Sequence, residues 1–163
     1  MKKVILLLVP GALSALVALA GFAVVHGIDA TPGECAGMTF DSIIHGTAGD
    51  DLIRATSGRD LIFALSGADT VFGRSGGDCI SGGAGDDVIT GGSGRDVIVG
   101  GDGADTIIGS SGADDLFGEA GDDALSGNTG SDSLDGGDGT DTANGGSATD
   151  ICTTSEITVS CEA

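Results

Sequence analysis

This chain of 163 residues contains no tryptophan and no tyrosine, and its lysines and arginines together number only 6. The missing aromatic side chains are those that commonly stack on sugar rings, which argues against a carbohydrate site built by stacking. Acidic residues number 25 and set the net charge at −19, which excludes nucleic acid as a partner. Of the two histidines, His26 lies in or just beyond an apolar N-terminal stretch, and His45 stands alone. We find no catalytic constellation, and we expect neither enzymatic activity nor a small-molecule substrate.

The dominant feature is a nine-residue repeat that runs from Gly46 to Thr153, twelve times without an insertion or deletion. Its consensus is GGxGxDxUx, where U is an aliphatic or small residue. The sixth-position aspartates are Asp51, Asp60, Asp69, Asp78, Asp87, Asp96, Asp105, Asp114, Asp123, Asp132, Asp141 and Asp150. The eighth-position residues are Ile53, Ile62, Val71, Ile80, Ile89, Ile98, Ile107, Leu116, Leu125, Leu134, Ala143 and Cys152. A period this strict predicts a stacked repeat fold.

Each copy divides into six turn residues and a three-residue strand. We expect glycines at the first, second and fourth positions to supply backbone conformations with positive φ, which other residues reach only at a cost. In the strand, the eighth-position side chain points to one face and its two neighbours point to the other. One such strand buries a single apolar side chain, so copies must stack to form a core. Two copies per coil predict a slender all-β solenoid of six coils with two facing parallel sheets.

The repeated aspartates predict metal sites. With two copies per coil, aspartates 18 residues apart, such as Asp51 and Asp69, lie in neighbouring turns on the same edge and repel each other. A hard divalent cation between the turns converts this repulsion into attraction, and exposed turn carbonyls add oxygen ligands. A set of six to eight oxygens favours calcium over magnesium. We therefore expect the repeats to be disordered without calcium and to fold as they bind it.

The charge balance is consistent with several ions. Removal of the first 20 residues would take away Lys2 and Lys3 and leave a net charge of −21 (4 − 25). Twelve turns on two edges make at most ten neighbouring pairs, which predicts up to about ten calcium ions.

The repeat closely resembles the hemolysin-type (RTX) calcium-binding nonapeptide family, and the resemblance covers residues 46–153. It implies a right-handed parallel β-roll in which the twelve aspartates and turn carbonyls bind calcium. The implied carbonyl ligands include Gly82, Gly83, Gly85, Gly91, Gly92 and Gly94. Copies two and three begin with Ala55-Thr56 and Ala64-Leu65, and copy twelve has Ala148 in place of a glycine. We therefore expect the best-formed sites between Asp78 and Asp141. The chain as a whole resembles short, stand-alone, secreted calcium-binding repeat proteins of bacteria.

The N-terminal segment predicts export. Lys2 and Lys3 precede an apolar run over residues 4–25, typical of a signal peptide over residues 1–20, with cleavage before Gly21 or as late as residue 30. An uncleaved membrane anchor is the alternative, because the run is long enough to span a bilayer. Extracellular calcium, near millimolar, suits low-affinity sites, so we expect a secreted, extracellular protein.

Four cysteines in an exported chain predict two disulfides. Three connectivities are open, and we favour Cys35–Cys79 with Cys152–Cys161. Residues 21–45 then form an N-terminal segment and cap, in which residues 31–45 cover the open end of the solenoid. Residues 154–163 form a C-terminal cap over the last coil.

Two classes of function follow. The first is an extracellular calcium-binding protein, and the second is an interaction or adhesion module that presents a calcium-stabilised flat sheet to a partner. Apolar residues at outward strand positions favour the second class. They are Leu61, Phe63, Phe72, Val97, Val99, Ile108 and Phe117.

Overall fold

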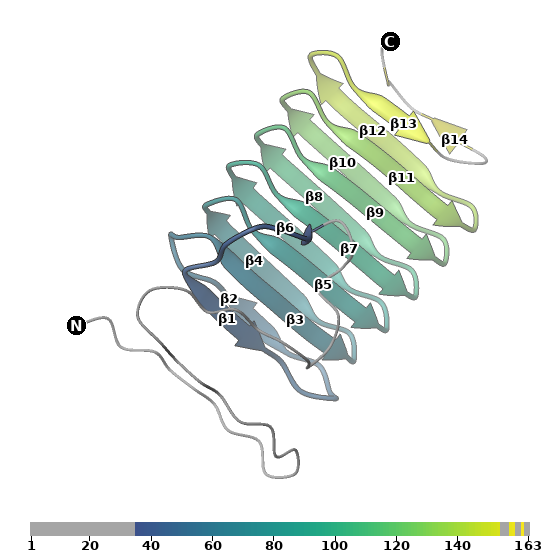
Figure 1. Cartoon of the computed structure of the whole chain (residues 1–163). Helices are drawn as coiled ribbons and strands as arrows, with labels where there is room; N and C mark the ends of the chain where they lie inside the picture. Colours follow the sequence, from purple (N-terminus) through teal and green to yellow (C-terminus); the bar gives the residue numbers. More distant parts are fainter. Residues whose placement is uncertain (1–34, 154–156, 159–160, 162–163) are drawn as a thin grey trace.

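The computed structural model describes residues 35–153, 157–158 and 161, so the predicted signal peptide lies outside the described residues. The described chain forms an all-β parallel solenoid of about six coils, with strands stacked side by side along one axis (Figure 1). In the described part, no helix is long and apolar enough to cross a membrane. The predicted fold class is confirmed.

Two parallel sheets of seven strands form the solenoid. Sheet A has the order β1-β3-β5-β7-β9-β11-β13. Its strands are β1 Ser42–His45, β3 Asp60–Ser66, β5 Cys79–Ala84, β7 Val97–Asp102, β9 Asp115–Ala120, β11 Ser133–Asp138 and β13 Ile151–Thr153. Sheet B has the order β14-β12-β10-β8-β6-β4-β2. Its strands are β2 Leu52–Arg54, β4 Thr70–Ser75, β6 Val88–Ser93, β8 Thr106–Ser111, β10 Ala124–Thr129, β12 Thr142–Ser147 and β14 Ile157–Thr158. Successive copies therefore alternate between the sheets, as the period predicts.

Most strands are six residues long, twice the predicted length. Strand β6 begins with the last three residues of one copy and continues through the first three of the next. Its pairing with β4 skips the first position, where Gly91 stands, and resumes at Gly92. The regular 18-residue register places equivalent residues of neighbouring strands opposite each other. As a result, the first three of the six residues expected in each turn belong to a strand instead. Only three residues per copy remain in the turn.

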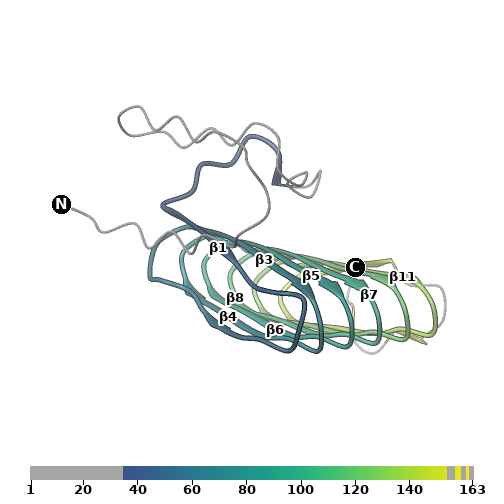
Figure 2. The same cartoon turned by 90° about the horizontal axis from the view of Figure 1, so that it is seen from below.

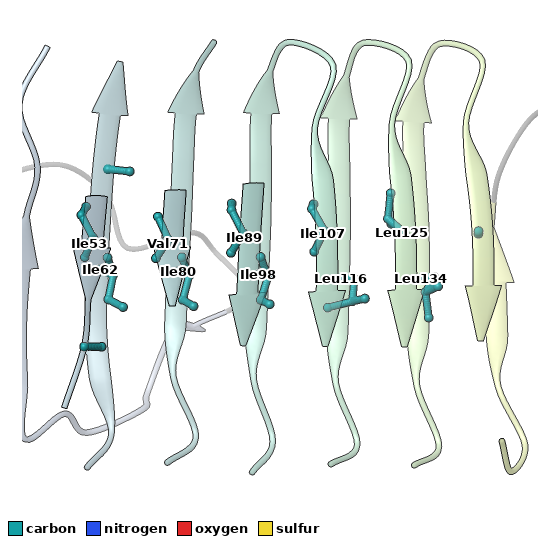
Figure 3. Close-up of a cluster of buried hydrophobic side chains, with 13 residues drawn as sticks. Ile53, Ile62, Val71, Ile80, Ile89, Ile98, Ile107, Leu116, Leu125 and Leu134 are labelled. Atoms are coloured by element: carbon teal, nitrogen blue, oxygen red, sulfur yellow. The ribbon is translucent and has the colours of Figure 1, made fainter. Parts of the chain in front are cut away.

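The main core is a narrow layer between the two sheets, made mostly of eighth-position side chains. Ile62, Ile80 and Ile98 come from sheet A and are fully buried. Val71, Ile89 and Ile107 come from sheet B and stack in the same narrow layer (Figure 3). Because each strand contributes about one such residue, a coil cannot form a core alone and depends on stacking against the neighbouring coils.

A second cluster lies outside the solenoid, on the outer face of sheet A. Leu61, Phe63, Cys79 and Val97 are buried there, together with Cys35. The segment 35–41 crosses this face (Figure 2), and Met38, Phe40 and Ile43 pack on the same cluster.

Of the segment 31–45, which we expect to cover the open end, the structure describes residues 35–45. Strand β1 is itself the first strand of sheet A, and Ile44 packs against the main core. The preceding segment instead covers outward side chains, because Leu61, Phe63 and Val97 form an apolar surface large enough to bury. Of the outward apolar residues, these three are buried, whereas Phe72, Val99, Ile108 and Phe117 are half-buried.

Both predicted disulfides are present. Cys35 and Cys79 join the N-terminal segment to β5, with 6.2 Å between their Cα atoms. Cys152 and Cys161 are linked with a Cα separation of 6.0 Å. Strand β14 pairs in parallel with β12, so residues 157–158 extend sheet B.

Candidate metal centre

The twelve sixth-position aspartates form two rows, one along each edge of the solenoid, at the point where each turn leads into a strand. Eleven of them, from Asp60 to Asp150, are at most 3% exposed, and Asp51 is half-buried. Carboxylates are rarely buried to this degree without a partner. The partners of each carboxylate oxygen therefore decide what the rows can do.

One oxygen of ten of these carboxylates, from Asp69 to Asp150, is satisfied by the backbone of the preceding coil. The Asp60 N–H donates to Asp78 Oδ1 at 2.8 Å, and the Asp69 N–H donates to Asp87 Oδ1 at 2.8 Å. The same bond recurs at every step of 18 residues, from the Asp51–Asp69 pair to the Asp132–Asp150 pair. We call this series the Asp ladder. It orients each side chain, and sequence reasoning did not predict it.

The second oxygen of ten carboxylates is buried and accepts no hydrogen bond. These are the Oδ2 atoms of Asp69, Asp78, Asp87, Asp96, Asp105, Asp114, Asp123, Asp132, Asp141 and Asp150. A buried carboxylate oxygen without a donor or cation is costly. Because the same atom is unsatisfied in ten consecutive copies, the arrangement is a repeated property of the turn rather than a local defect.

First-position glycines make room for these oxygens. A Cβ on Gly82 would collide with Asp87 Oδ2 and with the Gly100 carbonyl oxygen of the next coil. A Cβ on Gly73 would meet the equivalent pair, Asp78 Oδ2 and the Gly91 carbonyl oxygen. A carboxylate oxygen and a carbonyl oxygen, neither of which carries a proton to donate, therefore converge on one small space.

Within the repeats, positive φ occurs only at the second and fourth positions, so the expectation of positive φ at the first position is wrong. Gly83 (φ 113°) and Gly85 (φ 125°) show the pattern, which holds in copies three to twelve. At these positions it is the preceding coil that approaches closely, because a Cβ on Gly83 or Gly85 would collide with the carbonyl oxygen of Leu65 or Gly67. Columns of carbonyl oxygens thus run along each edge beside the aspartates.

The six glycines proposed as carbonyl ligands lie in these columns. Gly82 and Gly91 are first-position residues beside Asp87 Oδ2 and Asp96 Oδ2. Gly83 and Gly92 take the second position, and Gly85 and Gly94 take the fourth; all four have positive φ. The structure therefore brings these backbone positions and the aspartates together in the same turns.

Burial raises the pKa of the central aspartates. The pKa rises to about 7 for Asp78, Asp96 and Asp105 and to about 6 for Asp114, mainly by desolvation and further by neighbouring aspartates, while the Asp ladder bonds oppose the rise. The pKa of four others is raised for the same reason, and these are Asp69, Asp87, Asp123 and Asp132. Such shifts mark carboxylates whose charge lacks compensation.

The donor set fits a hard cation. Among the described residues, no three or more His, Cys, Asp and Glu side chains cluster as a metal site, so backbone carbonyls would have to supply most of the ligands. Carboxylate and carbonyl oxygens without nitrogen or sulfur are the ligands that calcium prefers. Asp51 and Asp60 differ from the other ten, because Thr47 and Thr56 donate to their Oδ2 atoms.

Comparison with known proteins agrees with this reading of the turns. A family model described as "RTX calcium-binding nonapeptide repeat (4 copies)" matches residues 45–80, 72–107, 81–116, 90–125 and 117–152. These matches overlap or adjoin and extend from the end of β1 to β13. No curated protein matches the chain.

Proposed function

The chain belongs to the RTX calcium-binding nonapeptide repeat family, and from this premise we propose that it binds calcium between successive turns of the solenoid and folds as it does so. One observation carries the proposal: ten buried Asp Oδ2 atoms have no hydrogen-bond partner. A cation at each of these positions would supply the missing interaction.

The proposed ligands are the sixth-position carboxylates and the carbonyls of the first, second and fourth positions. Calcium takes six to eight oxygens at about 2.3–2.6 Å, and its flexible geometry suits a site shared between two turns. Asp87 Oδ2 and the Gly100 carbonyl show how each site would draw on two neighbouring coils. An ion in that position would hold one coil onto the next.

Coupling of folding to binding follows from the same contacts. The unfolded chain cannot bring turns 18 residues apart together, so calcium binds the folded state preferentially. At a free concentration about ten times the dissociation constant, each ion would contribute ~1.4 kcal/mol to the stability of the roll. The two disulfides and the low-affinity type of site support an extracellular setting.

The test is a count of bound calcium by equilibrium dialysis, with two matched variants. Asp96→Asn should reduce the count, because the Asp96 Oδ2 is buried without a donor. Asp102→Asn removes the same charge from an exposed position on β7 and should leave the count unchanged. Equal counts in wild type and Asp96→Asn would contradict the proposed ligand role.

A second candidate function, presentation of a flat sheet to a partner, is favoured by the distribution of charge. Apart from sixth-position Asp60, five acidic residues lie on described strands, and all belong to sheet A: Asp102, Asp115, Glu119, Asp135 and Asp138. The strands of sheet B contain none and carry Arg54 and Arg74 instead. Sheet B is therefore the face on which a second copy of this acidic chain meets the least repulsion.

We propose that in calcium two copies associate through sheet B, where Phe72 and Ile108 are half-buried and Val88 is 43% exposed. Sedimentation velocity would test this with Ile108→Glu on sheet B and Val99→Glu at the equivalent position on sheet A. Loss of a dimer with Ile108→Glu alone supports the proposal. A wild-type chain that stays monomeric with calcium bound refutes it and leaves calcium binding itself untouched.

A further inference from the structure

In the first coil, the Oδ2 atoms of both sixth-position aspartates accept hydrogen bonds from the chain itself. The Thr47 N–H and Oγ1 donate to Asp51 Oδ2 at 2.6 and 2.9 Å. The Thr56 N–H and Oγ1 donate to Asp60 Oδ2, both at 2.8 Å. In each case a second-position threonine reaches the sixth-position aspartate of its own copy. These are the two copies whose Oδ2 atoms are satisfied, and the other ten Oδ2 atoms are not.

The backbone changes with the residue. Thr47 and Thr56 are not among the described residues with positive φ, whereas the second position of each later copy is left-handed. That is so even where the residue is not glycine, as at Leu65 (φ 87°), Arg74 (φ 82°) and Asn128 (φ 72°). A β-branched threonine strongly disfavours positive φ. Its presence therefore selects a turn in which the N–H and hydroxyl point to the carboxylate.

The first coil also has contacts that the later coils lack. The Ser42 hydroxyl donates to Asp60 Oδ1, so both oxygens of that carboxylate are satisfied. The segment 35–41 buries Leu61 and Phe63, and the Cys35–Cys79 disulfide fixes it to sheet A. This end of the solenoid thus has hydrogen-bond donors, a second apolar cluster and a covalent link in place of a cation.

We infer that the N-terminal coil is a calcium-independent cap. In this cap, Thr47 and Thr56 donate hydrogen bonds to the Asp Oδ2 atoms, and in later turns calcium takes the place of these donors. The inference rests on the proposed function, because it divides the twelve aspartates into two groups. Asp51 and Asp60 serve the cap and bind no ion through Oδ2, and the ion series begins at Asp69 and Asp78. The cap presents preformed strand edges at β2 and β3, and on these the later coils are added from the N-terminus as calcium binds.

Ion counting tests the division of the aspartates. Asp51→Asn with Asp60→Asn should bind as many calcium ions as wild type. Asp87→Asn with Asp96→Asn, the same substitutions two coils further along, should bind fewer. An equal loss from both pairs would show that the first coil holds ions and would overturn the inference. No calcium uptake by the wild-type chain would instead refute the proposed function, so the two failures are distinguishable.

Hydrogen exchange of the metal-stripped chain tests the cap directly. We expect slow exchange over β1 to β3, residues 42–66, and fast exchange over β6 to β13. Thr47→Val with Thr56→Val keeps the shape of both side chains and removes their hydroxyls, and should speed exchange over residues 42–66 at least tenfold. Thr70→Val with Thr90→Val, at outward positions of sheet B, is the control and should have no effect there.

Exchange over residues 42–66 that is as fast as over the later repeats in the metal-stripped wild type would overturn the inference. So would a Thr47→Val and Thr56→Val chain whose exchange over that segment equals that of the control.

Discussion

The backbone N–H of Asp78 donates to Asp96 Oδ1 at 2.8 Å, which joins two residues one coil apart. This bond uses one oxygen of Asp96 and directs the other, Oδ2, to a buried position where it has no donor. The preceding coil therefore fixes the position of the Asp96 carboxylate, but no donor compensates its charge. Stacked along both edges, this geometry makes the stability of the roll depend on whether a proton or a cation occupies each carboxylate.

The first prediction concerns pH. For the aspartates whose pKa is raised, protonation favours the folded state. Their contribution to the stability of the fold is therefore fully present below the unfolded-state pKa of about 4, and it is lost as pH rises through the folded-state pKa. For Asp78, Asp96 and Asp105 the folded pKa is about 7. The metal-stripped chain should therefore show more β signal in circular dichroism at pH 5 than at pH 8.

Two sets of Asp→Asn substitutions, one at buried and one at exposed positions, test whether the buried carboxylates cause this pH effect. Asparagine at Asp78, Asp96 and Asp105 mimics the protonated state and should flatten the pH dependence. Asparagine at the exposed Asp86 and Asp102 should leave it in place. More β signal at pH 8 than at pH 5 in the metal-stripped wild type would contradict the assigned cause.

The second prediction concerns glycine at the first position. Gly91→Ala adds a Cβ that collides with Asp96 Oδ2, so it should remove at least one ion and lower the midpoint of thermal unfolding in calcium. Gly49→Ala adds a Cβ with no atom within 4 Å and without positive φ, and it should be neutral or stabilising by ~0.4–1 kcal/mol. Calorimetry and ion counting on both variants check the difference. Identical behaviour of the two would show that space beside Asp96 is not required.

The third prediction compares the two disulfides. Cys35 and Cys79 are 44 residues apart in sequence, whereas Cys152 and Cys161 are 9 apart. A disulfide that closes a longer loop restricts the unfolded chain more. The resulting stabilisation of the folded state is ~4 kcal/mol for the first disulfide and ~2.6 kcal/mol for the second. Alanine at Cys35 and Cys79 should therefore lower the thermal midpoint more than alanine at Cys152 and Cys161. The opposite order would mean that the N-terminal segment contributes little to the stability of sheet A.

Much of the architecture could be predicted from the repeat itself. A period of nine with an aliphatic residue at the eighth position leads to stacked strands, and residues such as Ile80 and Ile89 lie in the core as expected. The Asp ladder could not be predicted in the same way, because it joins a backbone group to a side-chain oxygen and depends on the rotamer. Its trace in the sequence is the first-position glycine, which has no positive φ and instead leaves room for Oδ2.

The N-terminal segment shows a different limit. Leu61, Phe63 and Val97 occupy outward strand positions, and alternation correctly places them outside the main core. What covers them is set by the chain before the repeat, which has no period to interpret. The cysteine at position 79 was the available signal, since its disulfide to Cys35 brings that segment onto the outer face of sheet A.

The most direct test of the account is a calcium titration of the metal-stripped, disulfide-bonded chain, followed by far-ultraviolet circular dichroism, with stoichiometry from calorimetry. We expect a cooperative gain of β signal as several ions bind, ten at most if each unsatisfied Oδ2 atom marks one site. A chain that shows its full β signal in chelator and takes up no calcium would contradict it. The buried aspartates would then be held by protons and backbone donors alone.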